Sequence, residues 1–201
     1  MCRKRLTLVA VVTLTLAVSG YADTKTPAGV PRILVVVAPT DFTDQEYYDT
    51  RSALDAAHAN VTVGSTTISQ AVSHAGKRLK VDVALPNVRV QDFDAIVIVG
   101  GAGVVSSLLN YLPLRQLLLE ASKAEKVIAA ICIAPMVLAK AGLLKGVRAT
   151  CYLDKTVVGV LKANGADYVD QQVVVTGRII TANGPEASGA FGRAVVAVVS
   201  A

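Results

Sequence analysis

The fold is decided by the stretch KVIAAICIAPMVLA, residues 126–139. Its first half is a short apolar run rich in β-branched residues, which predicts a buried strand. Its second half opens at Pro135 and predicts a helix with proline in its first turn. Cys132 lies on the turn between them, where a sharp strand-to-helix bend would expose the thiol beside backbone N–H groups. We expect a reactive thiol with a lowered pKa; the alternative is a buried structural cysteine.

Continuous apolar runs also occur on the N-terminal side of this stretch. Residues 32–38 and 93–101 predict two strands buried on both faces, as in parallel sheets. Strands and helices alternate along the chain, which predicts an α/β fold with a doubly wound, mostly parallel sheet sandwiched by helices, of flavodoxin-like type. Ligand sites in such folds lie at the carboxyl ends of the strands.

The other elements follow from periodicity, caps and turn signals. Helical spacing predicts helices at 46–59, at 104–122 with a break at Pro113, at 156–164 and at 187–199. Strand patterns predict 61–65, 79–85, 147–152 and a hairpin of 173–175 with 178–181. Residues 39–44 are expected to form a loop, and 66–77 a polar connection. The first helix is expected to include His58 and to be capped by Thr43 or Asp44.

The N-terminus has the features of a targeting segment. Arg3, Lys4 and Arg5 precede an apolar run at 6–18, and small residues follow at Gly20 and Ala22. We expect residues 1–22 to be a signal peptide, 23–31 a flexible leader and 32–201 a single domain. The protein would then be exported, periplasmic or secreted, with no membrane association after cleavage; an uncleaved anchor is the alternative.

Removal of residues 1–22 changes what the net charge implies. The formal charge falls from +5 to +2, because three basic residues and no acidic ones are lost. The apparent basicity therefore belongs largely to the signal, and a nucleic-acid partner is not expected. The domain keeps Cys132 and Cys151, which an oxidising compartment would allow to pair, although their spacing does not decide whether they do.

Three predicted strand ends carry residues suited to chemistry. Gly100 and Gly101 would let the backbone approach a substrate, and their N–H groups with that of Ile133 would hold an oxyanion. Glu46, in the first turn of the first helix, would hydrogen-bond the thiol of Cys132. The simpler alternatives are a tight turn at the glycines and an acid favoured by the helix dipole at Glu46.

These residues fall into motifs that resemble the ThiJ/PfpI (DJ-1-like) family, part of the class I glutamine-amidotransferase-like superfamily. The resemblance covers residues 32–199. It implies that Cys132 is the nucleophile or redox thiol, Glu46 its carboxyl partner, and Gly101 and Ile133 the oxyanion donors. It also places Tyr152 near the thiol and Pro185 in the pocket. The motifs, in family order, are DFTDQE (41–46), FDAIVIVGG (93–101), AICIAP (130–135), AGLLKG (141–146), TCY (150–152), Thr181 and GP (184–185).

Departures from the family pattern limit the chemistry. The protease-like branch has a histidine after the cysteine, which would act as its base, and here that residue is Ile133. His58 and His74 are not expected to substitute for it. Val99 and Ala134 replace a proline and a glycine of the pattern. A histidine-assisted peptidase is therefore not expected.

Three functions remain open. The first is a glyoxalase- or deglycase-like enzyme, a lyase or hydrolase, that uses Cys132 and Glu46 on small carbonyl substrates. The second is a non-enzymatic redox sensor or chaperone in which Cys132 is oxidised. The third is a binding module with a degenerate pocket.

The remaining expectations concern cofactors and partners. The sequence GAGVVS at 101–106 follows a strand, but it lacks the third glycine and the later acid of a dinucleotide site. No cofactor is expected, and no His, Cys and acid cluster has metal-ligand spacing. The resemblance implies a homodimer or a higher homo-oligomer and a small-molecule substrate.

Overall fold

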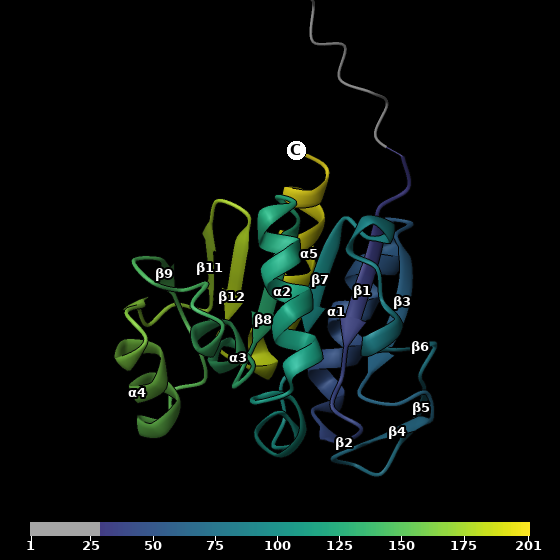
Figure 1. Cartoon of the computed structure of the whole chain (residues 1–201), viewed down its shortest axis with the longest axis horizontal. Coiled ribbons are helices and arrows are strands. Elements are labelled where there is room, and N and C mark those ends of the chain that lie inside the picture. Colours follow the sequence, from purple (N-terminus) through teal and green to yellow (C-terminus); the bar gives the residue numbers. More distant parts are fainter. Residues whose placement is uncertain (1–28) are drawn as a thin grey trace, which may run out of the picture.

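A seven-stranded sheet forms the centre of the computed structural model, which describes residues 29–201 (Figure 1). The signal-peptide prediction and most of the leader prediction lie outside the described residues. The strands are β1 (Arg32–Val36), β3 (Asn60–Ser65), β6 (Val83–Ala84), β7 (Ala95–Ile98), β8 (Val127–Ile131), β11 (Val173–Thr176) and β12 (Ile179–Ala182). Their spatial order is β11-β12-β8-β7-β1-β3-β6. Only the β11–β12 pairing is antiparallel within this sheet, so the predicted mostly parallel α/β fold is confirmed.

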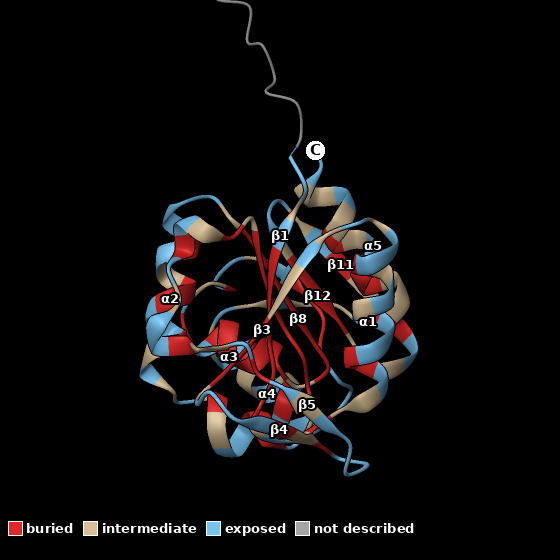
Figure 2. Ribbon diagram, turned by 90° about the vertical axis from the view of Figure 1, so that its right-hand side faces the viewer, coloured by how far each residue is buried: buried red, intermediate tan, exposed pale blue. Residues whose placement is uncertain are grey.

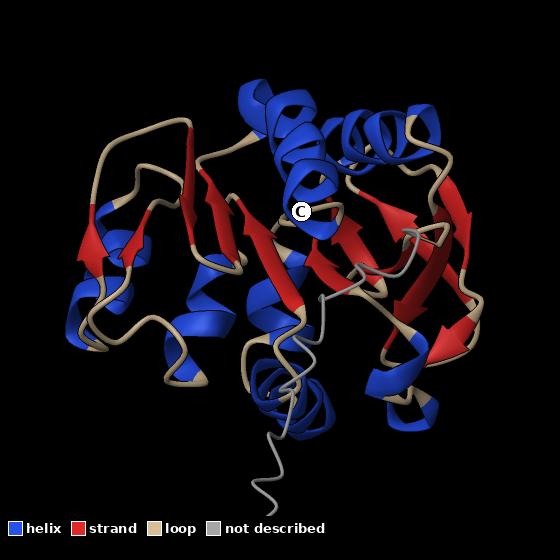
Figure 3. Cartoon of the chain, turned by 90° about the horizontal axis from the view of Figure 1, so that it is seen from above, coloured by secondary structure: helices blue, strands red, loops and turns tan. Residues whose placement is uncertain are grey.

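Helices cover both faces of this sheet (Figures 2 and 3). Helices α1 (Asp44–Ala56) and α5 (Ser188–Val199) pack together on one face. Helices α2 (Leu112–Lys123) and α3 (Pro135–Lys140) cover the other, and α4 (Lys155–Ala163) packs on α3.

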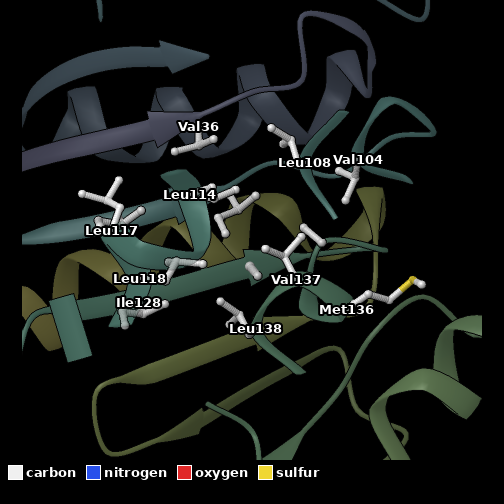
Figure 4. Close-up of a cluster of buried hydrophobic side chains, with 14 of the residues drawn as sticks. Val36, Val104, Leu108, Leu114, Leu117, Leu118, Ile128, Met136, Val137 and Leu138 are labelled. Atoms are coloured by element: carbon white, nitrogen blue, oxygen red, sulfur yellow. The ribbon is translucent and has the colours of Figure 1, made fainter. Parts of the chain in front are cut away.

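The apolar runs serve both faces because successive side chains of a strand point in opposite directions. In β1, Ile33 and Val35 join the core under α1 and α5, while Leu34 and Val36 join the core under α2 and α3. Figure 4 shows the core under α2 and α3, in which Val36 and Ile128 from the sheet pack against side chains of these helices. Val127–Ile131 is buried throughout, as its sequence predicts.

Several short elements differ from the predictions. The expected loop at 39–44 contains strand β2 (Thr40–Phe42), and the connection at 66–77 contains β4 (Gln70–Ser73). The single strand expected at 79–85 is two strands, β5 (Arg78–Lys80) and β6, in different sheets. Strands β2, β4 and β5 form a small sheet of their own. Strands β2 and β4, of three and four residues, are too short for an alternation pattern to indicate them.

The C-terminal half has smaller differences. The strand expected at 147–152 is only β9 (Arg148–Ala149), which pairs with an unpredicted β10 (Asp167–Tyr168). Short 3-10 helices at Leu85–Asn87, Val90–Asp92 and Pro185–Ala187 complete the elements. No helix in the described part of the chain is long and apolar enough to span a membrane.

Two predicted helices have different limits. The expected helix at 104–122 is a π-helical turn, Val104–Leu108, followed by α2, and Pro113 lies in the first turn of α2, where its missing N–H costs nothing. Helix α1 ends at Ala56, so His58, with a φ of 55°, lies beyond it. Thr43 occupies the N-cap position but makes no side-chain cap hydrogen bond, and Asp44, the other predicted cap, accepts hydrogen bonds from the Ser73 hydroxyl and the Ala75 N–H.

Candidate active site

Three adjacent strands of the central sheet, β1, β7 and β8, end at the same edge. The segment after β1 leads to Glu46, the Gly100–Gly101 pair follows β7, and Cys132 directly follows β8. The parallel order therefore brings together the three strand ends that the sequence singled out.

Cys132 occupies the turn between β8 and α3. Its φ of 64° lies in the left-handed region, which a non-glycine residue adopts only when its surroundings hold it there. Its backbone is held on both sides: the Cys132 N–H donates to the Ala182 carbonyl at 2.9 Å, and its carbonyl accepts from the Tyr152 N–H at 2.8 Å. The side chain is 8% exposed. The thiol is thus fixed at the sheet edge with little contact with solvent.

Glu46 lies in the first turn of α1 and is fully buried. The Gly100 N–H donates to Glu46 Oε2 at 2.9 Å, while the Gly100 carbonyl accepts from the Thr43 N–H at 3.1 Å. Both backbone groups of Gly100 therefore tie the start of α1 to the end of β7. Among the described residues, Glu46 Oε1 has no hydrogen-bond partner at ordinary distance and angle, although the side chains of Cys132 and Thr43 lie near enough to lower the pKa of Glu46.

The Glu46 carboxyl and the Cys132 thiol lie close enough to change each other's ionisation. Burial raises the pKa of Glu46 from 4.5 to about 7, against weaker opposing effects of Cys132 and the Gly100 N–H. Burial, followed by the charge of Glu46, raises the pKa of Cys132 far above its usual range. The prediction of a lowered thiol pKa is therefore wrong, chiefly because the thiol is buried. The N–H groups of Ile133 and Gly101 do act on the thiol in the expected direction, but they are outweighed.

The glycine pair is required by close packing around these two side chains. A Cβ at position 100 would come within 2.6 Å of both Cys132 Cβ and Glu46 Oε2. Gly101 has a φ of 109°, and a Cβ there would collide with the Asp41 carbonyl. The pair is thus a structural part of the site as well as a turn.

A cavity of about 370 Å³ opens over the thiol. Five of its lining residues besides Cys132 were singled out in the sequence: Glu46, Gly101, Ile133, Tyr152 and Pro185. Gly100 lies beneath them, against Cys132 and Glu46. The remaining lining residues are Asp41, Thr43, His74 and Ala102.

His74 is the main functional candidate that sequence reasoning missed. It lies in the turn after β4, and its Nδ1 is 2.7 Å from Asp41 Oδ1. Asp41 has a φ of 60°, a conformation that aspartate tolerates better than most residues. The sequence placed His74 in a polar connection and did not assign it to the site, but the unpredicted pairing of β2 with β4 brings it to the cavity wall. His58 does lie elsewhere, in a cavity at the amino ends of the strands.

The two cysteines are both free thiols in the structure. Cys132 packs in the core under α1 and α5, whereas Cys151 packs in the core under α2 and α3. Their side chains therefore face opposite sides of the sheet. Within residues 29–201, no group of three His, Cys, Asp or Glu side chains is arranged to hold a metal ion.

Comparison with known proteins identifies the family of this chain. The DJ-1/PfpI family model matches residues 31–198, nearly the whole described chain. The chain belongs to the DJ-1/PfpI family. The uncharacterized protein MJ0967 of Methanocaldococcus jannaschii is 39% identical over 168 residues, which cover 84% of this chain and 82% of that protein. The glutathione-independent glyoxalase DJR-1.2 of Caenorhabditis elegans is 31% identical, over 81% of this chain and 86% of that protein.

Solved DJ-1/PfpI structures have the same architecture. The ThiJ/PfpI domain protein of Brachyspira murdochii superposes with a TM-score of 0.81 at 30% identity, over 85% of this chain and 98% of that one. DJ-1beta of Drosophila melanogaster gives a TM-score of 0.76 at 27% identity, over 86% and 92% of the two chains. These neighbours confirm the family that the motifs indicated.

Proposed function

We propose that this DJ-1/PfpI protein is an exported, cysteine-dependent enzyme that converts small 2-oxoaldehydes into 2-hydroxy acids without glutathione. The observation that carries the proposal is the placement of Cys132 between the N–H groups of Gly101 and Ile133 and beside the buried Glu46. The relative DJR-1.2, named as a glutathione-independent glyoxalase, supports the same reaction class. Export rests on the pattern of residues 1–22.

The first step is addition of the Cys132 sulfur to the aldehyde carbon, which forms an S–C bond and an alkoxide. The N–H groups of Gly101 and Ile133, which act on the Cys132 thiol in the free protein, would stabilise that oxyanion. The proton on the former aldehyde carbon then moves to the neighbouring carbonyl carbon, so the first carbon becomes a thioester and the second an alcohol. Water cleaves the thioester, which releases the 2-hydroxy acid and returns the thiol. One oxoaldehyde and one water are consumed, and no external oxidant is needed.

Glu46 is suited to transfer the proton in this sequence. A pKa of about 7 lets a carboxyl group both donate and accept a proton near neutral pH. When Glu46 holds the proton, its negative charge no longer opposes the thiolate of Cys132. The pair thus carries at most one negative charge near neutral pH, and Glu46, which has the lower pKa, holds it.

Two alternatives receive less support. A peptidase lacks the neighbouring histidine, since Ile133 lines the cavity in its place. A redox sensor depends on a thiol with a high thiolate fraction, and burial next to Glu46 acts against the thiolate. A reaction in which Glu46 takes the thiol proton as the Cys132 sulfur adds to the substrate fits this environment better.

The test is turnover of methylglyoxal by the purified protein. Wild type and Cys151→Ala should form lactate, and Cys132→Ala should not. Cys151 is the matched control because it is the other buried free thiol in the described chain. Equal rates for wild type and Cys132→Ala would exclude Cys132 as the nucleophile.

A further inference from the structure

His74 and Asp41 form an ordered acid–base pair at the edge of the cavity. The His74 Nδ1 lies 2.7 Å from Asp41 Oδ1, and the His74 backbone N–H donates to the Phe42 carbonyl at 2.8 Å. In the tautomer that carries its proton on Nδ1, the imidazole donates a hydrogen bond to Asp41 Oδ1 and has its lone pair on Nε2. A base whose tautomer is fixed by a carboxylate is the arrangement that hydrolases use to activate a hydroxyl or a water.

The other charged side chains near this turn, Asp44 and Lys77, interact with other partners and not with His74 or Asp41. Asp44, the other carboxylate at this turn, is already occupied by the Ser73 hydroxyl and the Ala75 N–H. Lys77 lies over the ring of Tyr48, 4.9 Å from its centre. Asp41 is thus the carboxylate that orients His74.

The cavity therefore has two proton-transfer groups with opposite solvent access. Glu46 is 0% exposed beneath the thiol, while the side chain of His74 is 81% exposed at the rim. Both line the same space as Cys132. Glu46 can therefore exchange a proton with the buried thiol, whereas His74 can exchange one with solvent water.

We propose that His74, positioned by Asp41, is the base that activates water to release the acyl group from Cys132; this rests on the proposed role of Cys132 as nucleophile. Nε2 takes a proton from water as the water oxygen bonds to the thioester carbon. The S–C bond then breaks, the carboxylic acid leaves, and the proton returns through solvent to the pair of Cys132 and Glu46. Water and thioester give acid and thiol, so the step balances without another reactant.

The experiment measures deacylation directly. Excess p-nitrophenyl acetate is added, the unreacted ester is removed, and loss of the acetyl group from Cys132 is followed by intact mass. His74→Gln keeps a donor toward Asp41 but removes the base, and we expect deacylation about 10²-fold slower than in wild type. Asp41→Asn should lose part of the rate, because an amide does not fix the imidazole tautomer. Added imidazole should restore the deacylation rate of His74→Ala. It would not do so if the role of His74 were purely structural.

His58→Gln is the matched control, because His58 lies in the other cavity at the amino ends of the strands. It should deacylate at the wild-type rate. Equal rates for wild type and His74→Gln, or no acetyl group on Cys132 under excess ester, would overturn the proposal. Normal deacylation in a protein that does not turn over methylglyoxal would overturn the glyoxalase function and leave the role of His74 standing.

Discussion

The N–H of Gly100 donates a 2.9 Å hydrogen bond to Oε2 of Glu46, so the end of strand β7 holds a carboxyl group of helix α1 in the core. That carboxyl is fully buried, and its pKa is raised to about 7 by the loss of solvent. The same glycine would contact Cys132 if it carried a Cβ. Gly100 thus sets the distance between the acid and the thiol.

Replacing Glu46 with glutamine should separate thiol reactivity from turnover. Glu46→Gln removes the negative charge that helps to raise the pKa of Cys132, so alkylation by iodoacetamide at pH 7 should become faster. Methylglyoxal turnover should fall about 10²-fold, because an amide cannot transfer the proton. Slower alkylation in the variant would show that the carboxyl activates the thiol and does not restrain it.

The same residue should make stability depend on pH. The folded-state pKa of Glu46, about 7, exceeds its ordinary value of 4.5, so the folded state binds the proton more tightly. Its contribution is fully present below pH 4.5 and is lost as the pH rises through 7, by on the order of 3 kcal/mol. Urea unfolding at pH 4.5 and pH 8 measures this loss. Glu46→Gln is the control, because it keeps the pH dependence of all other groups and loses that of Glu46. Its free energy of unfolding should decrease less between pH 4.5 and pH 8 than that of wild type. An equal decrease in the two proteins would show that Glu46 does not have the raised pKa.

Gly100→Ala should damage both packing and chemistry. The added Cβ would lie 2.6 Å from Glu46 Oε2 and from Cys132 Cβ, so the free energy of unfolding should fall by about 1–3 kcal/mol, with loss of turnover. Gly159→Ala is the control, because a Cβ in that interior position of α4 meets nothing within 4 Å. It should stabilise the protein by up to about 1 kcal/mol. Urea unfolding and methylglyoxal turnover of the two variants test this contrast.

The charge of the cavity should select among carbonyl substrates. Asp41 and Glu46 line it, and the described lining includes no lysine or arginine. An anionic 2-oxoaldehyde such as 4,5-dioxopentanoate should therefore react at least about tenfold less efficiently than methylglyoxal, a difference of about 1.4 kcal/mol. Asp41→Asn should narrow the ratio of the two kcat/KM values. A higher kcat/KM for the anionic substrate would show that these two carboxyl groups do not set the substrate preference.

The strands that could be predicted most directly from the sequence are those whose two faces are both buried. Ala95–Ile98 and Val127–Ile131 are continuous apolar runs, and the parallel sheet follows from them. The short strands could not be predicted in this way, because β2, β4 and β10 contain too few residues to show a period. Their positions depend on pairing with partners distant in the sequence.

The site was predictable to a similar extent. Cys132 and Gly101 follow apolar strands, and parallel strands bring their ends together. His74 was missed because it is 33 residues from Asp41 and reaches it only through the β2–β4 pairing. The direction of the pKa shift at Cys132 was also missed, because it depends on the depth of burial and on a carboxylate from another helix.

The hydrogen bond from the Cys132 N–H to the Ala182 carbonyl has a consequence for biosynthesis. Translation proceeds from the N-terminus, so Cys132 is made well before the β11–β12 hairpin that completes its side of the sheet. Until then β8 is an edge strand, and the turn that carries the thiol lacks one of its two backbone anchors. The turn that carries Cys132 therefore gains its second backbone anchor, and the candidate site its final geometry, only after the β11–β12 hairpin has been made.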